Sequence, residues 1–342
     1  MLYKICVQQK FLCLVFLLVV SCSNPQSQGR RAVYYWRTDF TLSSEHIDQL
    51  NQFQITSLYV RIFDLDLQSN QLNPVAPLRV NSAFPVGFSF VPVIYITPAA
   101  LRSLHLISAS VLADKIINTI EEFQKKNHWP AYLELQLDAD WTSSNEEGYF
   151  QLLRQVKTRL NSAGVKLSST VRLHQLSNVN PPVDRQLIMI YNVNSLTNPN
   201  TDKTILPAKL AKRYIGNKLS QHGEIDIALP VYTWLSHFHG HRFLGLVHGV
   251  TESELRNSNV EQIRAGWYQA QGLIQLGNRK IAKGDFLRFE DSLADSVDMA
   301  NWLQEKLDSS QLKNSNMILF HYEPSLFHGN RRSSIQKIYS GY

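Results

Sequence analysis

The sequence predicts an α/β protein with a (β/α)8 barrel of the TIM type, and three observations lead to this prediction. Alternation of apolar and polar residues with period 2 recurs in eight stretches, which predicts eight strands. Stretches with helical periodicity separate most of them, and such alternation is typical of parallel β-α units. Several strands carry polar residues along one whole face, which suits the inside of a barrel better than an open sheet covered by helices on both sides.

The elements follow in order along the chain. The expected strands are Ala32–Thr38, Ser57–Phe63, Phe90–Ile96, Tyr132–Asp140, Lys166–His174, Gln186–Asn192, Ile225–Tyr232 and Met317–Tyr322. The expected helices are Ser44–Phe53, Ser108–Lys126, Glu146–Ser162, Pro207–Gln221 and Ala294–Leu307. Residues 64–88 show no helical pattern and residues 175–185 are too few for a full helix, so we expect an irregular barrel.

We expect the barrel to occupy residues 31–342, a length that (β/α)8 domains commonly reach. An α+β insertion of about residues 236–291 separates the seventh strand from the eighth. Within it, residues 266–289 predict short strands around the turn signals Gly272 and Gly277.

The insertion begins with the stretch SHFHGHRF, which holds His237, His239 and His241. Imidazole groups at alternate positions suit zinc. Gly240 and the polar surroundings nevertheless favour a solvated or locally hydrogen-bonded loop, and no nearby carboxylate lies at ligand spacing. The sequence therefore predicts neither a metal site nor another cofactor.

The first 21 residues combine Lys4 and Lys10 with a short apolar run, as in a secretory signal peptide. The run ends in Val19-Val20-Ser21-Cys22, which resembles a bacterial lipobox and predicts a lipid on Cys22. Residues 22–30 would then form a lipidated tether, and we expect a lipoprotein of the bacterial cell envelope held to a membrane. A plain secreted protein is the alternative. All 3 cysteines lie within the first 22 residues, so the mature chain has no internal disulfide.

The charge balance is mild. The formal net charge is +6, and it becomes +4 once Lys4 and Lys10 leave with the signal peptide. Basic residues adjoin only in pairs such as Arg30-Arg31, so we expect no nucleic-acid partner. We expect the chain to act as a monomer.

The fourth predicted strand contains the sequence LDADWT. It resembles the fourth-strand signature of chitinase-like glycoside hydrolases, Asp-x-x-Asp-x-Asp-x-Glu, in which an aromatic residue precedes the glutamate. Asp138 and Asp140 fall on its last two aspartates and Trp141 falls on the aromatic residue. Leu135 stands where the family has its first aspartate. Thr142 stands where the family has the glutamate that donates the proton.

Two further stretches support this alignment. Met189–Asn192, MIYN, resembles the sixth-strand Met-x-Tyr-Asp of chitinases, with Asn192 in place of the aspartate. Ala228–Tyr232, ALPVY, resembles the seventh-strand Leu-Pro-x-Tyr, and many chitinases carry an insertion after it. The chain is also similar to a group of bacterial lipoproteins with glycosidase-like barrels. The resemblance implies a barrel with a glycan ligand.

Glycoside hydrolysis usually needs two carboxyl groups about 5 to 9.5 Å apart. Asp138 and Asp140 lie two positions apart on one strand face, about 6.6 Å between Cα atoms, so both can reach one cavity. A threonine hydroxyl cannot donate a proton near neutrality, so another acid must replace the glutamate. Glu323, at the end of the eighth strand, is our preferred candidate. The other candidates are Asp39, Asp64, Asp66, Glu146 and Glu147.

Polar and aromatic residues at the predicted strand ends are candidate substrate-binding residues. They are Arg61, Trp141, Arg172, His174, Tyr191, Asn192, Tyr232 and Trp234. Aromatic rings suit sugar faces, although barrel strands favour aromatic residues in any case. Arg61 and Arg172 have a second interpretation, in which they neutralise Asp138 and Asp140 in a structural network inside the barrel.

Three hypotheses of function follow. In the first, a lipid-anchored, glycosidase-like barrel binds a cell-envelope or environmental glycan, and hydrolysis of that glycan is left open. In the second, it binds the glycan without catalysis, as a binding or scaffold protein. In the third, it is a barrel enzyme of another class that holds an anionic group through Arg61, Arg172 and His174.

Overall fold

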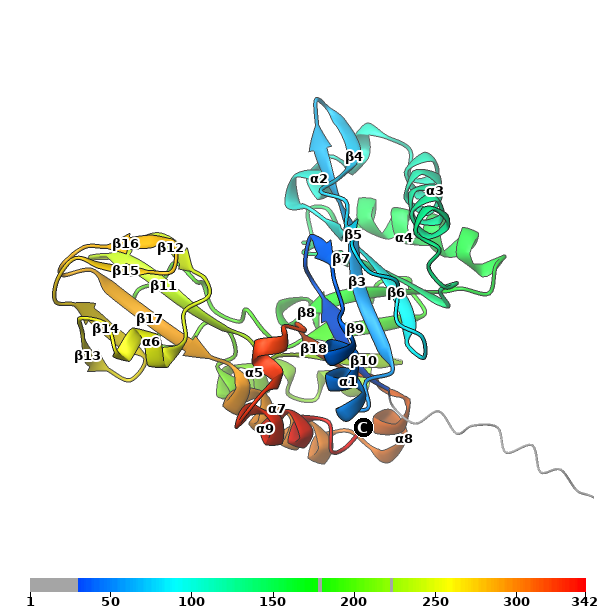
Figure 1. The fold of residues 1–342 in the computed structure, drawn as a ribbon. Coiled ribbons are helices and arrows are strands. Elements are labelled where there is room, and N and C mark those ends of the chain that lie inside the picture. The colour runs from blue at the N-terminus through cyan, green and yellow to red at the C-terminus, as the bar shows by residue number, and fades with distance from the viewer. Residues whose placement is uncertain (1–29, 178–179, 222–223) are drawn as a thin grey trace, which may run out of the picture.

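The computed structural model describes residues 30–177, 180–221 and 224–342. Eight parallel strands form a closed barrel, because the first strand pairs with both the second and the eighth (Figure 1). In chain order they are β1 (Arg31–Tyr35), β3 (Ser57–Gln68), β6 (Ser89–Ile96), β7 (Glu134–Ala139), β8 (Lys166–Arg172), β9 (Arg185–Met189), β10 (Ile225–Pro230) and β18 (Met317–Phe320). The predicted (β/α)8 barrel is confirmed.

The structure also accounts for the region without helical pattern after the second barrel strand. β3 continues to Gln68 and turns back as the antiparallel strand β4 (Gln71–Val75). The two-residue strands β2 (Asp39–Phe40) and β5 (Arg79–Val80) then pair with each other. A hairpin therefore replaces the helix that a regular barrel has at this place.

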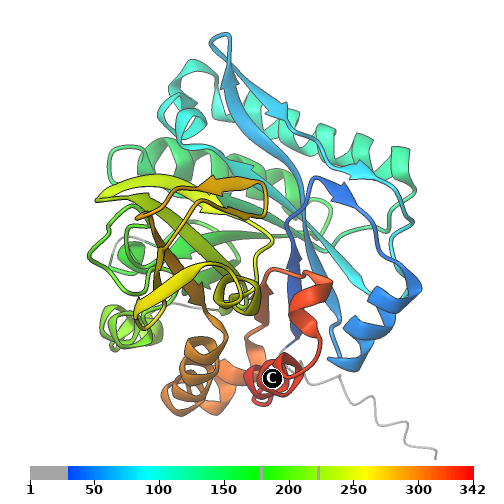
Figure 2. The ribbon, with the colours of Figure 1, turned by 60° about the vertical axis from the view of Figure 1, so that its left-hand side comes forward.

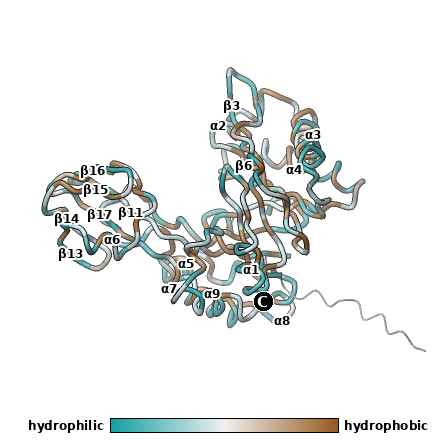
Figure 3. Tube along the Cα trace, viewed as in Figure 1, coloured by the Kyte–Doolittle hydropathy of each residue, from teal (hydrophilic) through white to brown (hydrophobic). Residues whose placement is uncertain are grey.

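Helices cover the outside of the barrel (Figure 1). The longer ones are α1 (Ser44–Gln52), α3 (Ala109–Asn127), α4 (Glu146–Asn161), α5 (Ala208–Ile215), α7 (Leu293–Lys306) and α9 (Arg331–Ile338). The shorter ones are α2 (Pro98–Arg102) and α8 (Ser309–Asn314). Hydrophobic and hydrophilic residues alternate along α3 in Figure 3, as an amphipathic helix on a barrel requires.

The helix predicted for residues 207–221 is shorter than expected. α5 ends at Ile215, and Gly216 follows with a φ of 49°. A residue with positive φ cannot continue a right-handed helix, and glycine adopts this conformation at the lowest cost. The 3-10 helix η3 (Lys218–Gln221) follows.

The insertion folds as a separate sheet that stands out from the barrel, and Figure 2 brings it forward. Its elements are β11 (Thr233–His239), β12 (Arg242–Val247), α6 (Glu252–Arg256), β13 (Val260–Arg264), β14 (Trp267–Ala270), β15 (Ile274–Leu276), β16 (Arg279–Ile281) and β17 (Phe286–Asp291). The sheet order is β12-β11-β17-β14-β13, with β15-β16 as a separate hairpin. Leu235, Leu255, Tyr268 and Leu287 belong to its own buried core.

The predicted signal peptide, the lipidation site Cys22 and the tether up to residue 29 lie outside the described residues. Within the described ranges, no helix is both long and apolar enough to cross a membrane.

The barrel interior is polar in the half near the starts of the strands, which we call the base of the barrel. Glu134 accepts hydrogen bonds from Ser168 at 2.6 Å and from Tyr59 at 3.3 Å. Arg185 bonds the buried Asp226 through Nε at 3.1 Å. Burial raises the pKa of Glu134 to about 7, with a further increase from the charge of Asp226, and the bond from Ser168 opposes this shift. Two carboxyl groups and one guanidinium thus share the base of the barrel.

A Glu134→Gln variant is expected to be more stable than the wild type at pH 8 and to differ little from it at pH 5. A raised pKa means that the folded protein holds a proton that the unfolded chain releases, so the wild type loses stability as the pH rises from about 4.5 to about 7. Thermal unfolding of both proteins across this range measures the effect, expected to be several degrees at pH 8. Parallel pH profiles for the two proteins would contradict it.

Candidate functional site

The carboxyl ends of β7 and β8 carry a charged group at the mouth of the barrel. Arg172 contacts Asp138, with Nη2 and Oδ1 3.3 Å apart, and also hydrogen-bonds Asp140 through Nε. Thr170 donates a second hydrogen bond to Asp138 at 2.6 Å. The side chain of Asp138 is 3% exposed and that of Asp140 is 45% exposed. One guanidinium therefore serves a buried and an exposed carboxylate, as the structural-network interpretation of Arg172 expects.

Burial raises the pKa of Asp138, while Arg172 and the bond from Thr170 counteract part of that rise. Burial acts to lower the pKa of Arg172, but the charges of Asp138 and Asp140 outweigh it and hold the pKa above its ordinary value. Arg172 is thus a permanent cation between the two carboxylates, and its single charge offsets one negative charge of the pair.

A second charged pair lies on β3. Arg61 bonds Asp64 at 2.7 Å between Nε and Oδ1. The register of β3 against β6 shifts between Arg61 and Phe63, which places Arg61 opposite Val93 and Asp64 opposite Tyr95. An irregularity of this kind lets residues three apart lie on one face. Arg61 therefore neutralises Asp64, and not Asp138 or Asp140 as the structural-network interpretation also supposed.

The two charged groups influence one another. Asp64 adds to the raised pKa of Asp138. Tyr95 lies on the adjacent strand β6, and its pKa is raised to about 12, first by burial and then by Asp140 and Asp138. The mouth thus holds three carboxylates and two guanidinium groups beside a phenol that stays protonated at neutral pH.

Aromatic rings surround this charged centre. Trp36 lies 6.2 Å from Tyr95 and 5.5 Å from Phe320 between ring centroids. Phe320 also lies 5.1 Å from Tyr191 and 5.9 Å from Tyr232. The guanidinium of Arg172 lies 5.9 Å from the ring centre of Tyr191. We call the five aromatic residues Trp36, Tyr95, Tyr191, Tyr232 and Phe320 the aromatic floor. All of them except Tyr191 are half-buried.

The predicted residues of the sixth and seventh strands also meet at the mouth. The Tyr232 hydroxyl donates to the Asn192 side chain at 2.8 Å. Trp234 packs against Tyr232 at 5.4 Å between ring centroids, and its indole nitrogen donates to Glu290 at 3.1 Å. Glu290 belongs to β17, so this bond joins the mouth to the base of the insertion.

Trp141 does not lie at the site, and its prediction as a substrate-binding residue is wrong. It has no exposed surface and packs against Phe150 of α4 at 5.2 Å between ring centroids. β7 ends at Ala139, but the side chain of Trp141 still points to the outside of the barrel, as alternation along the strand predicts. The ring is therefore part of the layer between barrel and helices.

The preferred acid, Glu323, lies on the rim and not in the charged centre. Its side chain is 41% exposed and accepts a bond from Arg37 at 3.1 Å. His321 lies between it and the aromatic floor, 5.3 Å from Phe320 between ring centroids, and burial lowers the pKa of His321. His174 is exposed in the 3-10 helix η2 (Leu173–Gln175) after β8.

Thr142 lies in an exposed turn before α4, where its backbone N–H donates to Asn145 at 2.8 Å. Of the other candidate acids, Asp39 is bound by Arg79 through two bonds of 2.6 Å, and Glu147 by Arg154 at 2.8 Å. Asp64, described above, is the member of that set whose charge acts on Asp138. Asp66, at the end of β3, accepts a bond from Thr97.

Phe320 and His321 belong to the mouth, although neither is among the predicted site residues. Tyr322, the predicted end of the eighth strand, instead donates a hydrogen bond from its hydroxyl to Gln49 of α1 at 2.8 Å. The strand ends at Phe320, two residues earlier than predicted, and the aromatic run Phe320-His321-Tyr322 gave no sign of which ring faces inward.

The histidine stretch is not a loop, and that prediction is wrong. His237 and His239 belong to β11, and the turn at Gly240 leads into β12. Asp285, far away in sequence, bonds His237 and His239 at 2.7 Å each. Burial acts to raise the pKa of Asp285, but the bonds from the two histidines lower it overall. Across the described part of the chain, no three His, Cys, Asp or Glu side chains are arranged to hold a metal ion.

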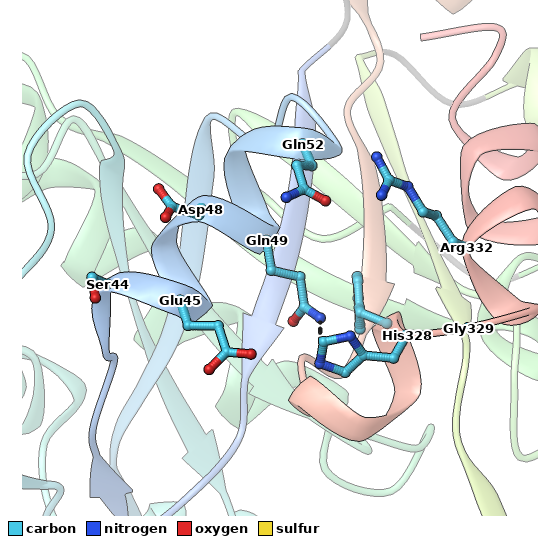
Figure 4. A pocket seen from close by; sticks show the side chains of 9 residues that line it. Ser44, Glu45, Asp48, Gln49, Gln52, His328, Gly329 and Arg332 are labelled. Carbon is cyan, nitrogen blue, oxygen red and sulfur yellow. Dashed lines mark hydrogen bonds between the residues drawn. The ribbon is translucent and has the colours of Figure 1, made fainter.

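A cavity of about 400 Å³ lies outside the barrel, between α1 and the chain that leads into α9 (Figure 4). Glu45 and Asp48 line one side, and His328 and Arg332 line the other. Gln49 bonds a ring nitrogen of His328 at 3.1 Å. Two carboxylates, one guanidinium and an imidazole line the cavity, so groups of both signs face any ligand that enters it.

The sequence matches no protein-family model and no curated protein. Solved structures do resemble the fold. A chitinase from Chromobacterium violaceum has a TM-score of 0.60 at 10% identity, covering 91% of this chain and 99% of that one. A class V chitinase from Nicotiana tobaccum in complex with NAG4 has a TM-score of 0.55 at 14% identity, covering 92% and 100%. The spore cortex-lytic enzyme SleL from Bacillus cereus has a TM-score of 0.52 at 17% identity, covering 90% and 75%. The chain therefore has the fold of a chitinase-like (β/α)8 barrel.

Proposed function

We propose that the mouth of the barrel binds a glycan without hydrolysing it by the route of chitinases. The observation that carries this proposal is the aromatic floor around Asp138, Arg172 and Asp140. Half-buried rings offer flat apolar faces to the C–H faces of a sugar, and the charged groups beside them offer hydrogen bonds to its hydroxyls. Structural neighbours that hold sugar oligomers support a ligand of this class.

Two features argue against the chitinase route. Thr142 replaces the proton donor of the family pattern and cannot act as an acid near neutral pH. Asp138 and Asp140, the aspartates that the family uses to support the acetamido group of the substrate, already bind Arg172. The acid of the chitinase route is thus missing, and the aspartates that the route needs are already paired with a cation.

The third hypothesis, an enzyme that holds an anionic substrate, needs free guanidinium groups. Arg61 is paired with Asp64, and Arg172 is paired with Asp138 and Asp140. Because these carboxylates neutralise both cations, an anionic ligand gains little from either. We therefore favour a neutral glycan.

We also propose that a lipid on Cys22 holds this barrel in the bacterial cell envelope. The lipobox-like sequence at residues 19–22 supports the proposal. A protein that binds a glycan without cleaving it has no product to release, which is compatible with a fixed position at a membrane.

A Trp36→Ala variant is expected to bind the tetramer of N-acetylglucosamine at least tenfold more weakly than the wild type, since loss of a central aromatic contact often costs about 2 kcal/mol and about 1.4 kcal/mol is a factor of ten. Isothermal titration calorimetry measures the affinity, and mass spectrometry of the same mixture is expected to show intact tetramer. Other neutral oligosaccharides tested in the same way would identify the preferred sugar.

Trp302→Ala is a matched control, because Trp302 lies on α7 outside the barrel and is also partly buried. It is expected to leave affinity unchanged. Equal affinities for Trp36→Ala and the wild type would contradict the proposed site. Cleavage products that disappear in Asp140→Asn or Glu323→Gln would show that the protein is an enzyme instead.

A further inference from the structure

The barrel has a second cavity, of about 350 Å³, at the end opposite the mouth. Its lining comes from the starts of six barrel strands. Arg30 precedes β1, Leu133 precedes β7, Lys166 begins β8, Arg185 begins β9, Glu224 precedes β10, and Lys313 lies in α8 before β18. Barrels of this class have their active sites at the other end, so the glycan site gives this cavity no role.

Basic side chains predominate around the cavity. Arg185 bonds Glu224 at 2.7 Å and also binds Asp226, so its charge is already matched. Lys166 lies 3.9 Å from the same Glu224. Arg30 and Lys313 are exposed and form no ion pair with any of the described residues. Cationic groups therefore remain available to an anion that enters the cavity.

The acidic groups at the cavity do not cancel this charge. Glu224 is shared between Arg185 and Lys166. Glu134 also lines the cavity, where it accepts hydrogen bonds from Ser168 and Tyr59, and burial raises its pKa to about 7. A substantial fraction of Glu134 is therefore protonated near neutral pH, which weakens its repulsion of an anion.

We propose that this cavity binds the phosphate headgroup of an anionic phospholipid. A phosphate fits both its volume and its excess of cations. A membrane is the favoured source for two reasons. Arg30, where the expected lipidated tether leads into the barrel, is itself part of the lining. Leu133, also in the lining, is 72% exposed and offers an apolar side chain to a bilayer.

Figure 1 is consistent with such an arrangement. α8, which carries Lys313, lies at the lower end of the barrel, and the β3–β4 hairpin lies at the upper end. The strand starts would thus face the membrane, with the glycan site pointing away from it. This inference goes beyond glycan binding and does not require it.

The test uses unlipidated protein of residues 23–342, which contains all eight barrel strands. Vesicles of phosphatidylcholine with 30% phosphatidylglycerol are expected to co-sediment with the protein, and vesicles of pure phosphatidylcholine are not. Arg30→Glu combined with Lys313→Glu is expected to weaken binding at least tenfold, because each basic residue near an anionic surface contributes about 1 kcal/mol.

Lys280→Glu combined with Lys283→Glu is the matched control, since it changes the net charge equally on the exposed surface of the insertion. This variant is expected to bind anionic vesicles nearly as well as the wild type. Equal losses in the two double variants, or no loss in either, would overturn the cavity as the site. Binding of inorganic phosphate by calorimetry, without binding to anionic vesicles, would overturn the membrane as its source. Glycan affinity measured on the same variants separates this test from that of the mouth.

Discussion

Replacing Arg172 with alanine is expected to cost about 3–5 kcal/mol of folding free energy, because it leaves Asp138 buried beside Asp140 with no cation. Thr170 would remain as a hydrogen-bond donor to Asp138, but one hydroxyl cannot offset the loss of a guanidinium. Urea denaturation at pH 7 measures the effect, and the loss is expected to shrink at lower pH, where Asp138, whose pKa is already raised, takes up a proton.

Arg154→Ala provides the control for this prediction. Arg154 also pairs with a carboxylate, Glu147, but the two side chains are 49% and 73% exposed. Its removal is expected to cost less than about 1 kcal/mol. Adding Asp138→Asn to Arg172→Ala is expected to recover part of the lost stability. A loss below 1 kcal/mol for Arg172→Ala would show that the two aspartates do not depend on this arginine.

A Trp141→Ala variant is expected to lose about 3–5 kcal/mol of stability, since its side chain is fully buried and its removal leaves a large cavity beside Phe150. The remaining folded protein is expected to bind the glycan with unchanged affinity, because the ring does not reach the mouth. Urea denaturation and calorimetry on the same sample measure the two quantities.

Trp36→Ala should show the reverse pattern, with a larger loss of affinity than of stability, because Trp36 is half-buried at the mouth. A tenfold loss of affinity in correctly folded Trp141→Ala would mean that the aromatic residue of the LDADWT stretch contacts the ligand after all, as the family resemblance implied.

The barrel was predictable because its strands alternate. In β7, Leu135 and Leu137 face the helices while Gln136 and Asp138 face the interior, and this pattern alone distinguishes a barrel from an open sheet. The short insertion strands around Gly277 were predictable from a different signal, the glycine of a turn, and Gly277 adopts a φ of 52° between β15 and β16.

Alternation fails where a strand ends or slips. The register shift after Arg61 turns Asp64 inward, although strict alternation from Arg61 would turn it outward. β18 ends at Phe320, so Phe320 and not Tyr322 contributes to the aromatic floor. Because site residues gather at strand ends, small errors in strand length become errors in the site.

Local periodicity and the residue at a given position were enough to predict the barrel, the place of the insertion and the replacement of the family's proton donor by Thr142. The three-dimensional fold was needed to show that Arg172 bridges Asp138 and Asp140, that Asp285 joins His237 and His239, and that six strand starts enclose a basic cavity. Arg172 and Asp140 are 32 positions apart in the sequence, and His237 and Asp285 are 48 positions apart. Each of these contacts depends on barrel closure or sheet register, which no local pattern in the chain specifies.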